Sequence, residues 1–160
     1  MGVATGRAHG LRLLGSGARV AVLLSDGECN EGSTWEAAMF AAANRLDNLL
    51  AVVDYNRIQS VGRTDELTGH TSFADKFRAF GWAACTIDGH DYGQLLPALA
   101  RFPFEPGKPS ALIAWTVAGR GVSFMEDQVL WHYRVPSADD LQRALAELEA
   151  APIHLSPETN

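Results

Sequence analysis

The chain has 160 residues, a length that favours one domain over two. Its 13 basic and 19 acidic side chains give a net charge of −6, and with no run of Lys or Arg the chain lacks the means to hold a nucleic acid backbone. Hydrophobic residues at 47% exclude a disordered chain, and no apolar stretch reaches the roughly 18 residues that a membrane-spanning helix requires. Because the first residues also lack a signal-peptide core, we predict a soluble, cytoplasmic protein without a membrane partner.

The first half of the chain alternates helical and strand patterns. An apolar stripe followed by glycines predicts a helix over residues 3–14. Short apolar runs at residues 19–24 and 49–53 are typical of buried strands. Between them, apolar residues at three- and four-residue steps predict a helix over residues 33–46, which Ser33 or Thr34 can cap.

The same alternation continues in the second half. Helical patterns cover residues 72–80, 91–102 and 136–150, and strand patterns cover 82–87 and 110–117. A polar and aromatic loop spans residues 119–133, and a loose tail is expected at 151–160. Buried-type strands that alternate with helices predict an α/β fold, with a parallel sheet and helices on both faces. No repeat or linker divides the chain, so residues 1–160 are expected to form one domain.

Polar oxygen ligands follow the first two predicted strands. Asp26 ends the first strand and Asn56 ends the second, 30 residues later. A right-handed crossover brings both to the carboxyl edge of a parallel sheet, where ligands of such sheets bind. Carboxylate and amide oxygens suit Mg²⁺ or Ca²⁺, and Mg²⁺ takes its remaining ligands from phosphates and water. The pattern therefore predicts a phosphate-bearing ligand, which Gly27 and Gly32 would let approach the backbone closely.

Asp26 and Asn56 have a simpler interpretation, because Asp and Asn are also ordinary turn residues. Other nucleotide motifs are missing: no GxGxxG follows the first strand, and the chain has no P-loop, so binding of NAD or FAD is not supported. Cys29 and Cys85 form no metal-type spacing.

Two stretches carry a resemblance to a known family. SDGECNEGSTWEAAMFAAANRLDNLLAVVDYNRIQSVGRT resembles the thiamine diphosphate motif of the transketolase family, which opens with Gly-Asp-Gly and closes with an Asn. TVAGRGVSFMEDQVLWHYRVPS also resembles that family, where a Lys/Arg-Gly loop leads to a His near the cofactor. The likeness is greatest to the split transketolases, in which the diphosphate-binding and pyrimidine-binding halves are separate polypeptides. It implies the thiamine diphosphate-binding fold, in its diphosphate-type domain.

The resemblance implies a cofactor site with named ligands. Asp26 and Asn56 would hold Mg²⁺, or Ca²⁺ or Mn²⁺ in its place, through their side chains, and Ile58 would do so through its carbonyl. Gly27 would donate its N–H to the diphosphate of thiamine diphosphate. Ile58 also has a simpler interpretation, as a core residue.

Two further residues are assigned catalytic roles by the resemblance. Glu31 stands where the family has a glutamate that contacts the catalytic glutamate of the partner subunit. His132 matches a histidine near the diphosphate and the substrate hydroxyl. The alternatives are a solvated carboxylate at a helix start for Glu31 and a surface or interface histidine for His132. His9, His70, His90 and His154 have no motif support and are interpreted as structural or surface residues.

The chain departs from the family pattern in two ways. Ser25 replaces the leading Gly of Gly-Asp-Gly, and a positive φ there would cost about 1 kcal/mol or more. The domain also lacks the segment that precedes the first helix in the family, so it is expected to be incomplete at its N-terminus and to expose apolar surface. Such a surface predicts an obligate partner or self-association. The resemblance implies that the partner is a separate pyrimidine-binding subunit, in a hetero-oligomer or dimer.

The function implied by the resemblance is transfer of a two-carbon ketol unit from a ketose, phosphorylated or free, to an aldose acceptor, together with the partner subunit. Two alternatives stay open at this point. The chain could be a subunit of another thiamine diphosphate enzyme, of the 2-oxo-acid dehydrogenase or synthase type. It could also be a non-catalytic truncated remnant that acts as a binding module.

Overall fold

The computed structural model describes residues 1–69 and 72–150. Its centre is a parallel sheet of four strands in the order β1-β2-β6-β5. The strands are β1 (Val20–Ser25), β2 (Leu49–Tyr55), β5 (Ala83–Asp88) and β6 (Ser110–Trp115). The longer helices are α1 (Gly2–Leu13), α2 (Gly32–Ala43), α4 (Phe73–Ala79), α5 (Tyr92–Ala100) and α6 (Ala138–Ala150). The predicted parallel α/β fold is confirmed, and the predicted tail at 151–160 lies outside the described residues.

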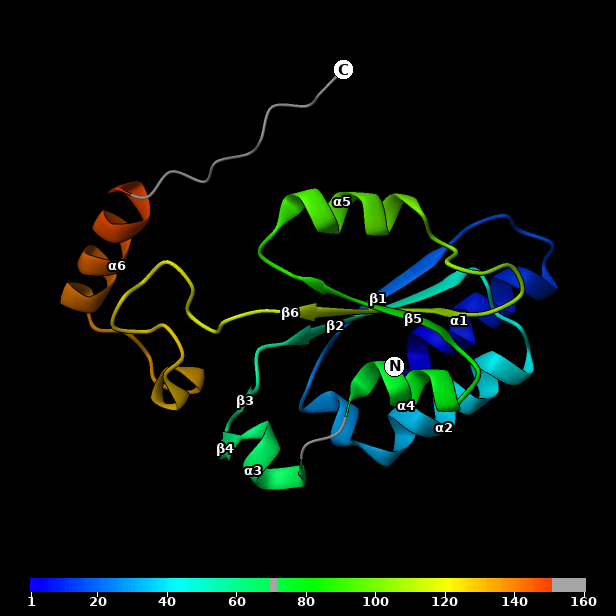
Figure 1. Cartoon of the computed structure of the whole chain (residues 1–160), viewed down its shortest axis with the longest axis horizontal. Helices are drawn as coiled ribbons and strands as arrows, with labels where there is room; N and C mark the ends of the chain where they lie inside the picture. The colour runs from blue at the N-terminus through cyan, green and yellow to red at the C-terminus, as the bar shows by residue number, and fades with distance from the viewer. Residues whose placement is uncertain (70–71, 151–160) are drawn as a thin grey trace, which may run out of the picture.

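Helices cover both faces of the sheet, as predicted. In Figure 1, α5 lies on one side of the strands and α1, α2 and α4 lie on the other. The larger core fills the side of α1, α2 and α4, where Leu24, Val53 and Phe77 are almost fully buried. A smaller core lies under α5, around Leu50 and Leu112.

The strands differ in burial according to their place in the sheet. β2 and β6 are central, and their near-continuous apolar sequences are buried on both faces. β1 lies at the end of the strand order, and its side chains alternate: Leu24 is 1% exposed, but Leu23 is 71% exposed. The prediction of a strand buried on both faces was therefore wrong for β1, because the core under α5 is built from residues of β2, β5 and β6.

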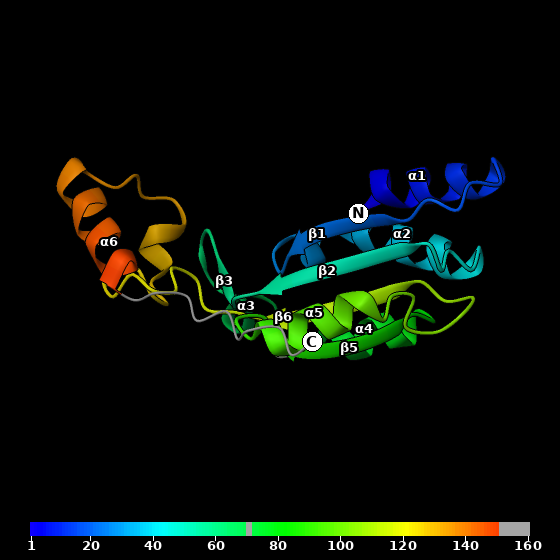
Figure 2. The ribbon, with the colours of Figure 1, turned by 90° about the horizontal axis from the view of Figure 1, so that it is seen from above.

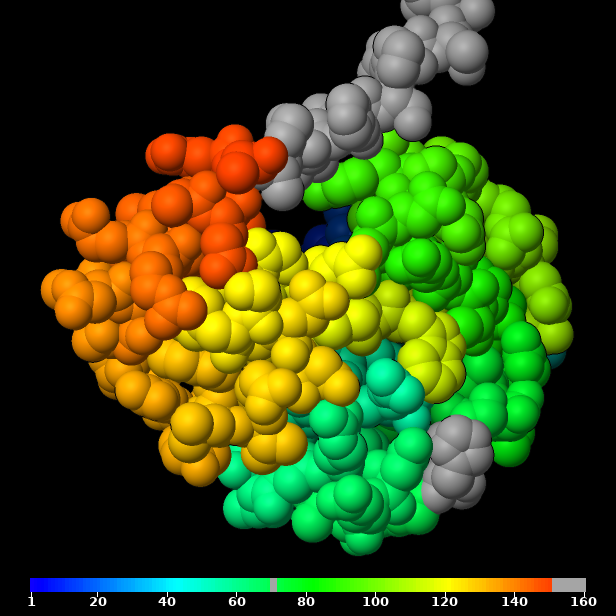
Figure 3. Space-filling view, turned by 60° about the vertical axis from the view of Figure 1, so that its left-hand side comes forward, coloured from blue at the N-terminus to red at the C-terminus, as the bar shows by residue number. Residues whose placement is uncertain are grey.

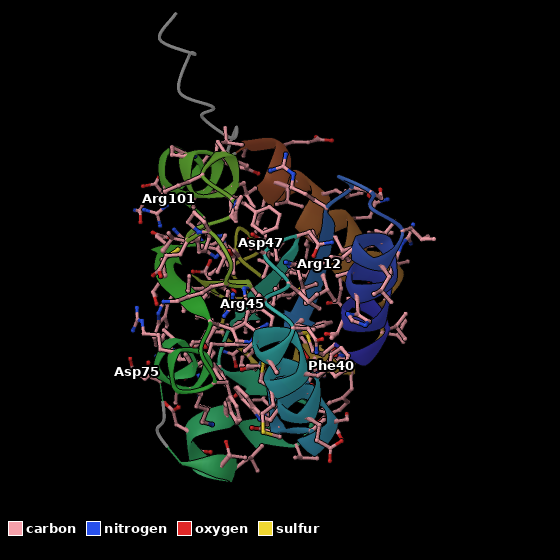
Figure 4. The ribbon with its side chains drawn as sticks, turned by 90° about the vertical axis from the view of Figure 1, so that its right-hand side faces the viewer. Arg12, Phe40, Arg45, Asp47, Asp75 and Arg101 are labelled. Carbon is pink, nitrogen blue, oxygen red and sulfur yellow. The ribbon has the colours of Figure 1, made fainter. Side chains whose placement is uncertain are left out.

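The two ends of the sheet have different roles. At the amino ends of the strands, Arg12 of α1 forms an ion pair with Asp47 at 3.5 Å and donates to the carbonyl of Arg45 (Figure 4). These contacts join α1 to the turn between α2 and β2. At the carboxyl ends, the chain extends beyond the sheet into short elements and α6, as the view from above shows (Figure 2).

These short elements were not predicted. They are an antiparallel hairpin of β3 (Ile58–Gln59) and β4 (Gly62–Arg63), the helix α3 (Thr64–Thr68), and the 3₁₀ turns η1 (Glu28–Asn30) and η2 (Val129–His132). The last of these lies inside the predicted loop at 119–133.

The start and end of α2 also differ from the prediction. The helix begins at Gly32 with Glu31 at its N-cap, and no side chain makes the capping hydrogen bond. Thr34 instead donates its hydroxyl to the carbonyl of Glu28 over 3.0 Å, so the predicted capping by Ser33 or Thr34 was wrong. The helix ends before residue 46 because Arg45 takes a left-handed φ of 51°, which leaves the helical path.

None of the helices in residues 1–69 and 72–150 is long and apolar enough to cross a membrane.

Candidate functional site

A cavity of about 340 Å³ opens at the carboxyl ends of β1 and β2. Its lining comes from both strand ends, from the hairpin β3–β4 and from η2, and consists of Ser25, Asp26, Gly27, Glu31, Asn56, Ile58, Gln59, Ser60 and His132. The six site residues named from the sequence are all part of this lining. Segments 106 residues apart in the chain, from Asp26 to His132, are thus brought to one place.

Asp26 is the central carboxylate of this cavity and is only 1% exposed. Its Oδ2 accepts a hydrogen bond from Thr64 Oγ1 at 2.6 Å, and its Oδ1 accepts one from the Gly27 N–H at 2.9 Å. Burial raises the pKa of Asp26 above its ordinary value, and these hydrogen bonds act against the rise. Among the described residues, no cationic side chain forms an ion pair with Asp26. A bound cation would stabilise this buried charge.

Asn56 and Ile58 supply the other predicted oxygen ligands. The side-chain Oδ1 of Asn56 accepts from the Ile58 N–H at 2.9 Å, which closes a tight turn after β2. Arg57 between them has a left-handed φ of 64°, and its side chain lines a different cavity, with its guanidinium 5.8 Å from the Trp115 ring centre. The turn thus leaves Asn56 and Ile58 on the side of Asp26. The Ile58 residue is 2% exposed, so its side chain is also a core residue.

These oxygen donors fit a hard cation. A carboxylate, an amide oxygen and a backbone carbonyl are the ligand types that Mg²⁺ takes, and they do not suit zinc. The described part of the chain contains no group of three or more His, Cys, Asp or Glu side chains placed to hold a metal. A site of this composition therefore depends on ligands from outside the chain, such as phosphate oxygens and water.

Ser25 and Gly27 differ from what the motif suggested. Ser25 is the last residue of β1, pairs with Asp54 in the extended ladder and has no positive φ, so the cost that a positive φ would impose on serine does not arise. Gly27 has a φ of −62°, and its N–H is bonded to Asp26. Donation from Gly27 to a diphosphate therefore requires this hydrogen bond to be shared or exchanged, and it stays a prediction.

Glu31 and His132 lie at the outer part of the cavity, and both are exposed. Glu31 is the N-cap of α2, which agrees with its alternative interpretation as a carboxylate at a helix start and also leaves it open to a second chain. His132 ends η2. The cavity brings both near the oxygen donors, and their catalytic roles stay predictions.

The sequence did not predict how His132 is held over the cavity. Arg63 of β4 forms two hydrogen bonds to the Asp127 carboxylate, at 2.9 and 3.0 Å, and a third to its carbonyl at 3.2 Å. Asp127 has a left-handed φ of 57° and precedes η2. Figure 3 shows the segment around Asp127, in yellow and gold, packed against the green hairpin and α3. The partners are 64 residues apart, so no local pattern signals the pair.

Replacing Asp127 tests the pairing of Arg63 with Asp127, which we call the Arg63–Asp127 clamp. In Asp127→Asn the left-handed residue is kept but the ion pair is lost, so hydrogen exchange over residues 119–133 should speed up, with a stability loss of about 0.5–1 kcal/mol for such an exposed pair. Arg63 holds the pKa of Asp127 below its ordinary value. The pair therefore stabilises the folded chain at pH values above the ordinary pKa, and this stabilisation is lost as the pH falls through the lowered pKa. Asp75→Asn, which breaks the exposed pair with Arg78, is the control (Figure 4). Equal exchange in both variants would contradict the clamp.

Two further histidines, His9 and His90, and the buried Cys29 do not line the cavity. His90 accepts a hydrogen bond from the Val117 N–H at 2.8 Å, and His9 packs edge-on against Phe40. His70 and His154 lie outside the described residues. Burial raises the pKa of the Cys29 thiol to about 12, which keeps it a thiol.

Comparison with known proteins agrees with the fold. The family described as transketolase, thiamine diphosphate binding domain, matches residues 15–152. The chain is 41% identical over 127 residues to the 6-deoxy-6-sulfo-D-fructose transketolase subunit SqwG of a Clostridium species, covering 79% of this chain and 46% of that protein. It is 37% identical over 139 residues to one of the subunits of the apulose-4-phosphate transketolase of Phocaeicola vulgatus, covering 87% of this chain and 50% of that one.

Solved structures show the same fold. The structure of the Pichia stipitis transketolase complex with sedoheptulose-7-phosphate matches 91% of this chain and 22% of its own, with a TM-score of 0.78 and 23% identity. The fold is that of a thiamine diphosphate-binding domain. The chain belongs to the transketolase family and carries its thiamine diphosphate-binding domain. It spans about half the length of the Clostridium and Phocaeicola relatives.

Proposed function

We propose that this chain is the diphosphate-binding part of a split transketolase. It binds thiamine diphosphate through Mg²⁺ and, with a pyrimidine-binding subunit, transfers a two-carbon ketol unit from a ketose or ketose phosphate to an aldose acceptor. The observation that carries the proposal is the meeting of Asp26, Asn56 and Ile58 in one cavity with Glu31 and His132. The names of its relatives, which describe them as subunits, support a complex of more than one chain.

Each residue has a role in this proposal. Asp26, Asn56 and the Ile58 carbonyl would hold the metal, which would supply the positive charge for binding a diphosphate. When bound, the cofactor supplies an electron sink for breaking the carbon–carbon bond next to a ketose carbonyl. His132 donates a hydrogen bond to the diphosphate or to a substrate hydroxyl, or moves a proton there. Glu31 extends toward the partner's glutamate, and a shared proton between two such carboxylates would raise the pKa of one of them.

Electrostatics favour an anionic cofactor only when the metal is present. The chain has a net charge of −6, and the cavity contains the carboxylates of Asp26 and Glu31. A free diphosphate would meet like charge there, whereas a Mg²⁺ ion between Asp26 and the diphosphate is attracted by both. The chain should therefore bind thiamine diphosphate in the presence of Mg²⁺, and its binding of the cofactor should be undetectable in the presence of EDTA.

The test of the proposed function is reconstitution. The chain is mixed with the pyrimidine-binding subunit of a split transketolase, with Mg²⁺ and thiamine diphosphate, and ketol transfer is measured from a panel of ketoses and ketose phosphates to aldoses. Transfer by the pair that neither chain shows alone would support the proposal. Decarboxylation of 2-oxo acids in place of ketol transfer would favour the second class of thiamine enzyme. Cofactor binding and partner binding without either reaction would favour a non-catalytic binding module.

Two finer points belong to the same proposal. The metal is Mg²⁺, although the oxygen ligands also admit Ca²⁺ or Mn²⁺. The location is cytoplasmic, as expected from the sequence, and fractionation of cells expressing the chain tests it.

A further inference from the structure

Thr64, at the first position of α3, is a buried polar residue to which the family resemblance gives no role. It is 2% exposed, and its Oγ1 donates to Asp26 Oδ2 over 2.6 Å. The side-chain Nε2 of Gln59 donates to the same Oγ1 over 3.3 Å. Because the hydroxyl accepts from Gln59, its own proton is left for the carboxylate. The two hydrogen bonds in series thus fix the direction in which Thr64 donates.

The backbone of Thr64 is anchored to the other side of the cavity. Its N–H donates to the Arg57 carbonyl over 3.0 Å, between Asn56 and Ile58. Its own carbonyl accepts from Thr68 Oγ1 at 3.0 Å, within α3. Thr64 therefore contacts both segments that supply the proposed metal ligands, the one after β1 and the one after β2.

We propose that Thr64 is a positioning residue for the metal site. By holding one oxygen of Asp26, it orients the carboxylate toward the cavity that Asn56 and Ile58 also line. The inference rests on the proposed function, because it assumes that the cavity binds a divalent cation. Partners that orient a metal ligand in this way typically change metal affinity by roughly 10- to 100-fold when they are lost.

The experiment separates the hydroxyl from the shape of the side chain. Mn²⁺, a paramagnetic ion with the same preference for oxygen ligands, is titrated into the chain with thiamine diphosphate, and free Mn²⁺ is measured by electron paramagnetic resonance. Thr64→Val keeps the shape and removes the donor, whereas Thr64→Ser keeps the donor. We expect Thr64→Ser to bind Mn²⁺ within about threefold of the unmodified chain, and Thr64→Val to bind at least about 10-fold more weakly.

The outcomes distinguish failure of the role proposed for Thr64 from failure of the proposed function. Mn²⁺ binding by Thr64→Val within threefold of the unmodified chain would overturn the inference, and so would equal weakening by Val and Ser, which would indicate packing. No Mn²⁺ binding by the unmodified chain would instead overturn the proposed function and the inference with it. If Thr64→Val does not fold, Gln59→Met keeps Thr64 and removes the hydrogen bond that directs it. That variant should bind Mn²⁺ more weakly than the unmodified chain, and unchanged binding would overturn the inference.

Discussion

Asp26→Asn should abolish Mg²⁺-dependent binding of thiamine diphosphate and leave the chain folded. The amide keeps the size of the side chain but removes the charged ligand, so we expect at least about a 100-fold loss of affinity, or about 2.7 kcal/mol, by isothermal titration calorimetry. Asp47→Asn, at the opposite end of the sheet, is the matched control (Figure 4), because it also replaces one carboxylate with an amide. Its affinity should equal that of the unmodified chain, and a similar loss in both variants would reject the metal assignment.

The same substitution should stabilise the chain in the absence of ligands. Burial raises the pKa of Asp26, so folding favours its neutral form. The stability that this group contributes is present below its ordinary pKa and is lost as the pH rises through the raised value. Near neutral pH, which is above its ordinary pKa, Asp26 therefore destabilises the metal-free chain, whereas the Asn side chain does not titrate and carries no such cost. The melting temperature of Asp26→Asn should exceed that of the unmodified chain at neutral pH and approach it in acid.

Gly119→Ala should disrupt the loop that carries His132. Gly119 has a left-handed φ of 71°, and a Cβ there would lie 2.7 Å from the backbone carbonyl of Met125. Because backbone cannot rotate away as a side chain can, the segment between them must move. We expect a destabilisation of about 2–5 kcal/mol in urea unfolding, from backbone strain and overpacking together. Cofactor affinity should also fall, since η2 and His132 follow this segment.

Gly107→Ala supplies the matched control for that prediction. Gly107 has a similar φ of 74°, but a Cβ there would meet no atom within 4 Å. This variant should be destabilised only by the cost of the left-handed backbone, about 1–2 kcal/mol. Its affinity for the cofactor should be unchanged. Equal losses of stability and affinity in the two variants would show that the contact with Met125 has no part in the effect.

The layers of the fold followed from local patterns. Apolar runs predicted the four strands and periodic apolar residues predicted the helices, because most of these patterns reflect burial against the same sheet. The exception is α6, which lies beyond the sheet. The elements that escaped prediction are short, with two to five residues each. The hairpin of Ile58–Gln59 and Gly62–Arg63 has two residues per strand, too few to show an alternation of apolar and polar side chains.

The site was predictable only where the motif carries it. Asp26 and Asn56 could be placed together from the crossover rule, since both follow parallel strands. The contact of Thr64 with Asp26 joins residues 38 apart, and that of Arg63 with Asp127 joins residues 64 apart. These pairings depend on how the hairpin folds over the strand ends, which no periodicity records. The burial that raises the pKa of Asp26 is likewise a property of packing, and a single carboxylate in a sequence does not reveal it.

The place of β1 at the end of the strand order affects how the protein can be handled. Among the described residues β1 pairs with β2 alone, so the backbone N–H and C=O groups along its outer side have no strand partner, and the exposed Leu23 lies beside them. Such an edge is a template for pairing with a strand of another molecule. Self-association at high protein concentration would compete with any protein that covers this edge, and binding measurements should therefore be made over a range of dilutions.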